Sequence, residues 1–276
     1  MIYYTNNDKK LIFNKAREKA YTALLETLDF LYGKDNISEL DFKKLWLSNI
    51  SNKNNVIAQG WYNPPIDGMA VLSGNKLNFD SLRNEEFFSD NTIIDWNNGY
   101  LYAYCSPVEK SDGYIGDMSV TLYFGKDERV IEHFKNVRKA IQDIFDHLES
   151  FNSPKDLYNY SLDIFKNHHL VSNVISRTDN MPSNLGHSFT HLDNAGNKEM
   201  LDENDIKYLS TNRQFINAQA DWKFINEIQF TVEPQLLSLD NPDLYKVTHH
   251  YVVKKVKDGF IVCNDIDYLL DKYGLK

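Results

Sequence analysis

Apolar residues recur at intervals of three and four between Lys9 and Tyr32, and Gly33 follows them. This spacing predicts an amphipathic helix that ends at a glycine in the left-handed conformation. Ser38, with two acidic residues in the next turn, predicts the N-cap of a second helix that runs to about Asn49. The chain is therefore expected to begin with a pair of helices.

Short apolar runs separated by turns follow this helical pair. The loop from Trp61 to Gly68 contains two adjacent prolines, which have no backbone N–H group to donate. Beyond the loop, strands are predicted at residues 69–72, 92–96, 101–105 and 119–124. An Asp-Gly turn at Asp112 and Gly113 precedes the last of them.

Helical periodicity returns in the second half of the chain. An apolar stripe predicts a long helix from Asp127 to Ser150. Ser153 and Pro154 then predict the N-cap and first turn of another helix, which runs to about Asn167. Further strands are predicted at residues 170–175, 227–232, 247–256 and 259–264.

Length and composition favour one large domain over residues 1–276. The chain has 276 residues, 42% of them hydrophobic, and shows no internal repeat, low-complexity tract or linker. It has no run of about 18 apolar residues and no basic, apolar start typical of a secretory signal. A protein without a membrane segment, located in the cytoplasm, is therefore expected.

Charge and cysteine content exclude two classes of function. The formal charge of -9 and the scattered basic residues argue against nucleic acid as a partner, since such binding needs a concentrated basic face. The only cysteines, Cys105 and Cys263, lie in apolar strand-like runs. A disulfide framework or a paired-cysteine zinc site is therefore not indicated, and two reduced, buried thiols are expected.

Four separated segments place a metal-capable side chain beside strand-like sequence. These side chains are Asp117, His187, Glu233 and His250. Two carboxylates and two imidazoles spread over half the chain meet only if several strands bring them together. Buried metal sites are commonly built in this way.

The local sequences resemble the pita-bread metallopeptidase superfamily, which includes methionine aminopeptidases, Xaa-Pro aminopeptidases, prolidases and creatinase. Phe230-Thr-Val-Glu233-Pro234 is similar to the family's Phe-Thr-Ile-Glu-Pro signature. Gly186-His187-Ser-Phe-Thr190 keeps the histidine of its Gly-His-Gly-Ile-Gly signature but fills the later glycine positions. The resemblance extends from about residue 10 to residue 264. It implies an α+β pita-bread fold, in which a curved antiparallel sheet is flanked by helices.

Two expected ligands differ from the family's pattern. Asp117 matches the second Asp ligand, but Ser106, eleven residues earlier, stands where the first Asp belongs. An insertion that brings in Asp95 is the alternative. The last ligand, a Glu before an Asp-Gly hairpin, aligns with His250.

The resemblance implies that Asp117, His187, Glu233 and His250 hold one divalent ion. Two metal ions need bridging carboxylates that offset their repulsion, and two such carboxylates are replaced here. Two histidines and two carboxylates suit iron, manganese or zinc. Each of these residues alone has a structural interpretation as well, as a buried histidine or as a carboxylate at a strand end. Their joint occurrence favours the metal.

Other side chains are candidates for a substrate pocket beside the metal. Ser106 and Tyr114 could orient water or substrate, and Trp61 and Tyr62 could shape the entrance. His191 lies near the position of a further family histidine but out of register, so that histidine's role is not transferred to it. No catalytic residue is assigned, and no Ser-His-Asp or Cys-His nucleophile is evident.

Three functions follow as hypotheses. The first is an enzyme with one metal ion that acts on a small amino-acid-like or amide-bearing substrate by hydrolysis, elimination or iron-dependent oxidation, and that is not a standard peptidase. The second is an aminopeptidase-like hydrolase in which Glu233 orients water. The third is a non-catalytic pita-bread protein that binds a peptide or protein. A homodimer is compatible with each.

Overall fold

The computed structural model describes residues 2–3, 12–78, 88–172 and 178–275. The chain divides into two compact units. Unit 1 contains residues 1–11, 126–189 and 213–276, and unit 2 contains residues 12–125 and 190–212.

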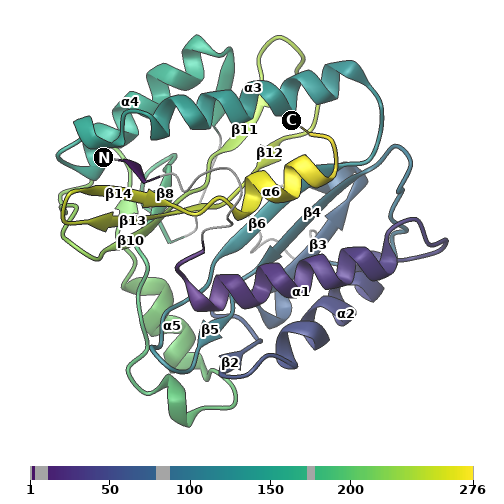
Figure 1. Cartoon of the computed structure of the whole chain (residues 1–276), viewed down its shortest axis with the longest axis horizontal. Helices are drawn as coiled ribbons and strands as arrows, with labels where there is room; N and C mark the ends of the chain where they lie inside the picture. Colours follow the sequence, from purple (N-terminus) through teal and green to yellow (C-terminus); the bar gives the residue numbers. More distant parts are fainter. Residues whose placement is uncertain (1, 4–11, 79–87, 173–177, 276) are drawn as a thin grey trace. The chain divides into compact units, whose positions relative to one another are not determined.

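Two N-terminal helices of unit 2 lie side by side (Figure 1). Helix α1 (Lys15–Leu31) begins at the N-cap Asn14, and Gly33, at φ 76°, lies just beyond its end. Helix α2 (Glu39–Ser51) begins with a capping box, in which Ser38 and Asp41 each accept a hydrogen bond from the other's backbone N–H. The Trp46 indole of α2 donates to the Ala20 carbonyl of α1 over 3.0 Å, which fixes the pair.

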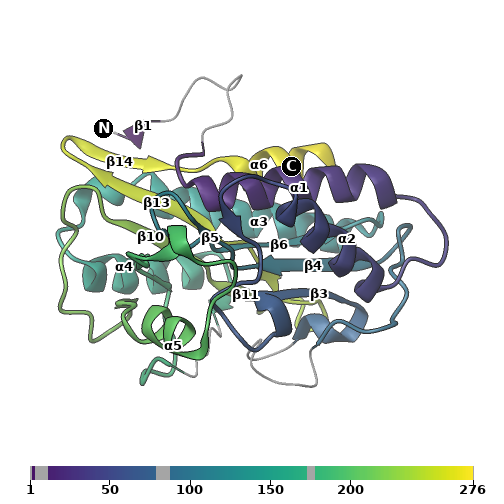
Figure 2. The same ribbon diagram turned by 90° about the horizontal axis from the view of Figure 1, so that it is seen from below.

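Antiparallel strands form the rest of the core of unit 2. The sheet has the order β3-β4-β6, and the strands lie next to one another in that order (Figure 2). Every residue of these three strands is buried. The strands and short helices of unit 2, besides α1 and α2, are β2 (Val56–Ile57), η1 (Ile66–Gly68), β3 (Met69–Ser73), η2 (Gly74–Asn78), β4 (Tyr100–Cys105), β5 (Val108–Glu109), β6 (Met118–Tyr123), η5 (Ala195–Asn197) and α5 (Glu203–Thr211). Strand β2 pairs with β5 in a separate antiparallel ribbon.

Unit 1 packs helices with three small sheets. The helices are α3 (Glu128–Phe145), η4 (Leu148–Ser150), α4 (Pro154–Asn167) and α6 (Asp265–Lys272). Helices α3 and α4, which follow one another in the sequence, pack against each other. Ser153 caps α4 by accepting the N–H of Asp156, and Pro154 occupies its first turn.

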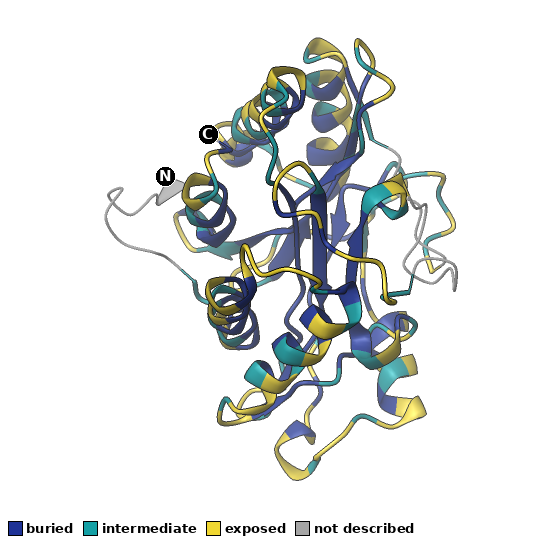
Figure 3. Ribbon diagram, turned by 90° about the vertical axis from the view of Figure 1, so that its right-hand side faces the viewer, coloured by how far each residue is buried: buried dark blue, intermediate teal, exposed yellow. Residues whose placement is uncertain are grey.

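The strands of unit 1 are antiparallel except at one edge. The sheet β1-β14-β13-β10 contains the only parallel pair among the described ladders, that between β1 and β14. A second sheet has the order β12-β11-β7, and β8 pairs with β9. The strands are β1 (Ile2–Tyr3), β7 (Leu170–Ser172), β8 (Gly186–His187), β9 (Phe215–Ile216), β10 (Gln229–Val232), β11 (Gln235–Ser238), β12 (Val247–Thr248), β13 (Tyr251–Val256) and β14 (Gly259–Val262). Figure 3 shows most strand residues buried, while the helices expose one side.

The architecture confirms the predicted α+β class, with helices and antiparallel sheets. The strand predicted at residues 92–96 is wrong, because Ile93 makes only an isolated bridge to Ser38. The first helix begins at Lys15, since residues 12–14 are not helical and residues 4–11 lie outside the described part. The end of the strand predicted at 170–175 also lies outside it.

Two further predictions concern the cysteines and the membrane. Cys105 and Cys263 are both buried free thiols, as expected. Among the described helices, none has the length and apolar character that crossing a bilayer requires.

Candidate metal centre

In unit 1, the Glu233 carboxylate lies between two imidazole rings. Its Oε1 is 3.8 Å from Nε2 of His187, and its Oε2 is 3.3 Å from Nδ1 of His250. All three residues are buried. Glu233 meets the two rings with different oxygens, so the three side chains form a row with the carboxylate in the middle.

Hydrogen bonds between the segments around β8 and β10 bring His187 and Glu233 together. The N–H of His187 donates to Oγ1 of Thr231 over 3.0 Å, and the N–H of Glu233 donates to the Leu185 carbonyl over 2.7 Å. Gly186 permits this approach, because a Cβ atom there would lie 2.2 Å from the Thr231 carbonyl oxygen. Any larger residue at position 186 would push β8 and β10 apart.

A hydrogen bond to the backbone fixes the tautomer of His187. Its Nδ1 lies 2.9 Å from the carbonyl oxygen of Ser188, so Nδ1 carries the proton and donates it. The lone pair of Nε2 is then left facing Glu233. Histidines that bind metals through one nitrogen usually hold the other in such a bond.

The donor set fits a cation. Nε2 of His187 and the Glu233 carboxylate both present lone pairs to each other, and Oε2 of Glu233 is buried without a hydrogen-bond donor. Such a buried carboxylate is costly unless a positive charge offsets it. Ligand atoms about 2.0–2.2 Å from one ion lie roughly 3–4 Å apart. The His187–Glu233 and His250–Glu233 distances each fall in this range, with a different oxygen of the carboxylate in each contact.

His249 and His250 occupy different environments, because the predicted strand 247–256 breaks between β12 and β13. The ring of His250 faces Glu233. The ring of His249 packs against those of Phe134 and Tyr251, with centroids 6.0 and 6.4 Å away. Burial, together with the charges of Arg138 and His250, lowers the pKa of His249 to about 3. His249 is therefore neutral at physiological pH.

In unit 2, Asp117 lies just before β6 and is buried. The buried guanidinium of Arg17 donates to its backbone carbonyl, which fixes the chain at this point. Burial raises the pKa of Tyr104 and Cys105, and the Asp117 carboxylate adds to both increases. Asp117 is thus a buried carboxyl group close enough to Tyr104 and Cys105 to affect both, and its role as a ligand stays a prediction.

Comparison with known proteins identifies the family. The sequence profile of metallopeptidase family M24 matches residues 13–255, which is most of the chain. The chain belongs to metallopeptidase family M24. No curated protein sequence gives a significant match.

Several solved structures share the fold. The X-Pro aminopeptidase of Thermotoga maritima MSB8 is 13% identical with a TM-score of 0.61, over 90% of this chain and 58% of that one. The prolidase of Pyrococcus horikoshii OT3 is 13% identical with a TM-score of 0.61, over 90% of this chain and 59% of that one. The methionine aminopeptidase of Rickettsia prowazekii is 16% identical with a TM-score of 0.54, over 92% of this chain and 98% of that one. The chain thus spans about three fifths of the first two proteins, and these likenesses show the pita-bread fold alone.

Ser106 stands where the sequence resemblance predicts an Asp ligand, and the structure shows which contacts this residue makes. The β4–β6 register pairs Cys105 with Met118, so its continuation sets Ser106 opposite Asp117. The Ser106 hydroxyl donates to the Gly68 carbonyl and accepts the N–H of Tyr62. Its oxygen lies 2.1 Å from where a Cβ of Gly60 would stand. Ser106 is therefore a packed structural hydroxyl, in surroundings too tight for an aspartate side chain.

The other residues predicted around an M24 pocket also belong to unit 2. Trp61 is fully buried, and its indole donates to the Gly116 carbonyl over 3.2 Å. Tyr62 meets the rings of Trp61 and Tyr104 edge to face. Tyr114 and the half-exposed His191 lie together, with ring centroids 5.7 Å apart, and His191 pairs with Asp193. Their roles at a pocket stay predictions.

Two residues near the M24 motifs change the sequence-based interpretation. Asp95 accepts hydrogen bonds from the backbone N–H groups of Asn97 and Asn98. Its carboxylate therefore stabilises a turn. Thr231, which holds the backbone of His187, was not predicted. Its place two residues before Glu233, on the same side of an alternating strand, was the available signal.

Proposed function

We propose that this M24 protein is an enzyme with a single divalent metal ion, bound by His187, Glu233 and His250 with Asp117 as the fourth ligand. The observation that carries the proposal is the row in unit 1, where a buried carboxylate lies between two imidazoles. Two carboxylates and two neutral imidazoles balance the charge of one divalent ion.

A divalent ion supplies Lewis acidity, which polarises a substrate carbonyl and makes water more acidic. The protein residues have separate tasks around it. His187 presents Nε2 in a tautomer fixed by Ser188, and Glu233 supplies negative charge. His250 directs Nδ1 at the second oxygen of the same carboxylate.

Two replacements support one ion rather than two. The position expected for one carboxylate is Ser106. Its hydroxyl already accepts the N–H of Tyr62 and donates to the Gly68 carbonyl. The position expected for the other is His250, a neutral ligand when it binds a metal. A second divalent ion would lack the anionic bridges that offset the repulsion between two such ions.

The proposed substrate is a small amino-acid-like or amide-bearing molecule, and the proposed chemistry differs from that of a standard peptidase. Family membership supports the substrate class, because the related structures are named as enzymes that act on peptides. The same likeness supports an alternative, aminopeptidase-like hydrolysis with Glu233 orienting water. The loss of two carboxylates favours the first function over the second.

Metal reconstitution tests this function. Apoprotein prepared without oxygen is loaded separately with iron(II), manganese(II) and zinc(II), then assayed for dipeptide cleavage, amide hydrolysis and oxygen consumption. Turnover of a small amide or amino acid with one metal per chain is expected, and efficient cleavage of ordinary dipeptides would favour the alternative.

Matched variants separate the site from the rest of the surface. Glu233→Gln is expected to abolish turnover, while Glu227→Gln, which alters an exposed carboxylate paired with Lys254, leaves it unchanged. Metal binding without turnover of any substrate, in a folded protein, would favour the non-catalytic binding protein. A cytoplasmic location and a homodimer remain predictions of the sequence.

A further inference from the structure

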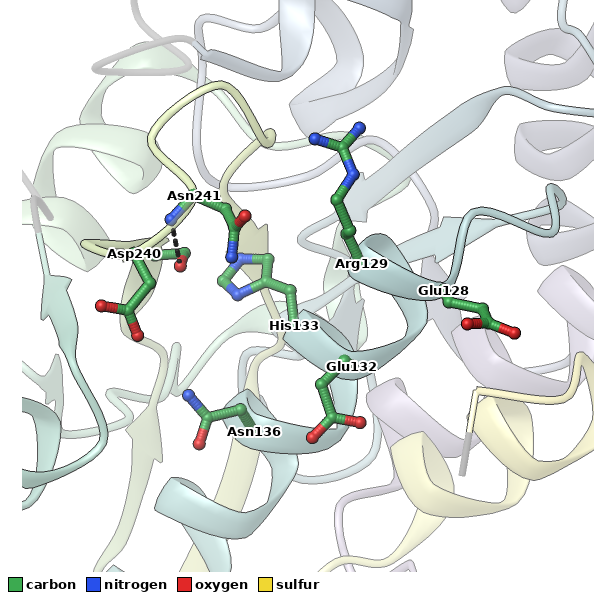
Figure 4. Close-up of a pocket in the computed structure, with 8 residues that line it drawn as sticks. Glu128, Arg129, Glu132, His133, Asn136, Asp240 and Asn241 are labelled. Atoms are coloured by element: carbon green, nitrogen blue, oxygen red, sulfur yellow. Dashed lines mark hydrogen bonds between the residues drawn. The ribbon is translucent and has the colours of Figure 1, made fainter.

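A separate pocket opens in unit 1 between the start of α3 and the loop after β11. Its volume is about 530 Å³, within the usual range for small-molecule sites. Figure 4 shows the side chains that form it, with the loop of Asp240 and Asn241 on one side and α3 on the other. The lining residues are Glu128, Arg129, Glu132, His133, Asn136, Ser238, Asp240 and Asn241.

His133 points from α3 toward the loop that carries Asp240 and Asn241 (Figure 4). The residue is 4% exposed, and neither ring nitrogen makes a hydrogen bond of normal geometry. Burial lowers the pKa of the ring, and weak hydrogen bonding to the backbone of Leu236 and Tyr245 opposes this shift without cancelling it. The ring is therefore a neutral, buried group with hydrogen-bonding capacity to spare, which is unusual in a protein interior.

Carboxylates dominate the mouth of the pocket. Glu128, Glu132 and Asp240 are exposed there. The single guanidinium, that of Arg129, is already paired with Asp127 at 2.9 Å and with Asp243 at 3.2 Å. The mouth consequently attracts cations. One of its carboxylates also has a partner in the protein, since Oδ1 of Asp240 lies 3.0 Å from Nδ1 of His169.

The remaining polar groups of the lining serve the fold. The Asn136 amide donates to the His168 carbonyl and accepts from its ring. The Ser238 hydroxyl accepts the backbone N–H of Asn241. His133 is thus the buried polar side chain of the lining that is left for a ligand.

We propose that this pocket binds a small aliphatic amine, with its ammonium group facing the carboxylates of the mouth and donating a hydrogen bond to the His133 ring. The ammonium is a donor in three directions and has no acceptor, which complements carboxylates and a neutral imidazole. An anion would be repelled by three carboxylates. A bare metal ion fits poorly, because Glu132, His133 and Asp240 do not bring their ligand atoms within 4.8 Å of one another.

Three probes of equal chain length test the proposal: n-butylamine, n-butanol and butyrate. Nuclear magnetic resonance of isotope-labelled histidine follows each titration of the full chain, and the His133 signals are those missing in His133→Phe. Saturable shifts with butylamine alone are expected. If the Phe variant does not fold, His133→Gln supplies the assignment.

Charge variants add a second readout. Glu132→Gln with Asp240→Asn is expected to raise the butylamine Kd about five- to tenfold, because each exposed ion pair contributes up to a few-fold. The control, Asp163→Asn with Glu203→Gln, removes the same charge from exposed residues that do not line the pocket, and should leave the Kd unchanged.

Several outcomes would overturn the proposal. These are the absence of saturable butylamine shifts, equal shifts with butanol or butyrate, and equal affinity in both double variants. Displacement of butylamine from His133 by zinc or magnesium ions would assign the pocket to a metal instead.

Discussion

The pH dependence of folding should report the buried His249 ring. This ring is 3% exposed and packs between Phe134 and Tyr251. Its pKa falls from 6.5 to about 3, chiefly through burial and then through the charges of Arg138 and His250. The native protein therefore does not protonate His249 until strongly acidic conditions.

The sign of the effect follows from proton counting. Between pH 6.5 and about 3 the unfolded chain binds a proton at His249 and the native chain does not. Stability therefore falls as the pH falls, with a limiting slope of about 1.4 kcal/mol per pH unit. Between pH 7 and pH 5 the free energy of unfolding should drop by about 2 kcal/mol through this residue.

Urea unfolding of the wild type and His249→Phe at several pH values measures this contribution. The difference in unfolding free energy between the two proteins should change by about 2 kcal/mol from pH 7 to pH 5, in favour of the variant at low pH. His147→Gln, which changes an exposed histidine, serves as the control. If the His249→Phe difference is independent of pH, His249 has the same pKa in the native and unfolded chains and the reasoning is refuted.

Two substitutions and one labelling experiment test the packing. Gly186→Ala should cost about 1–3 kcal/mol in urea unfolding, because its Cβ would lie 2.2 Å from the Thr231 carbonyl oxygen; wild-type stability would contradict the tight β8–β10 approach. Ser38→Ala should lower the unfolding free energy by about 1 kcal/mol through loss of the N-cap, and a neutral effect would mean the cap is redundant. Cys105 and Cys263 should react with a thiol reagent only as fast as the chain unfolds, since both are buried; rapid labelling of the native protein would show an accessible thiol.

Local signals predicted the helices well because their causes lie within a few residues. The N-caps at Ser38 and Ser153 and the left-handed Gly33 all occur where the sequence indicates. The short run at residues 92–96 misled the prediction, because its apolar residues serve packing rather than a ladder. Trp96, for example, is buried and donates from its indole to the Lys34 carbonyl.

Nonlocal pairing explains what the sequence did not reveal about the site. The motifs indicated His187 and Glu233 individually, but their separation depends on the close approach of β8 to β10, held by the hydrogen bond from His187 to Thr231. The break of the last predicted strand at His249 and His250 depends likewise on two different partner sheets, one for β12 and one for β13. Neither effect has a local sequence cause.

Metal stoichiometry tests the central claim most directly. Elemental analysis of the purified wild type and Glu233→Gln, each loaded with excess manganese or zinc and then desalted, counts ions per chain. One ion in the wild type and a large loss in the variant are expected, because the carboxylate lies between both imidazoles. No ion in the wild type, two ions, or one ion retained fully by Glu233→Gln would contradict a single metal held by Glu233.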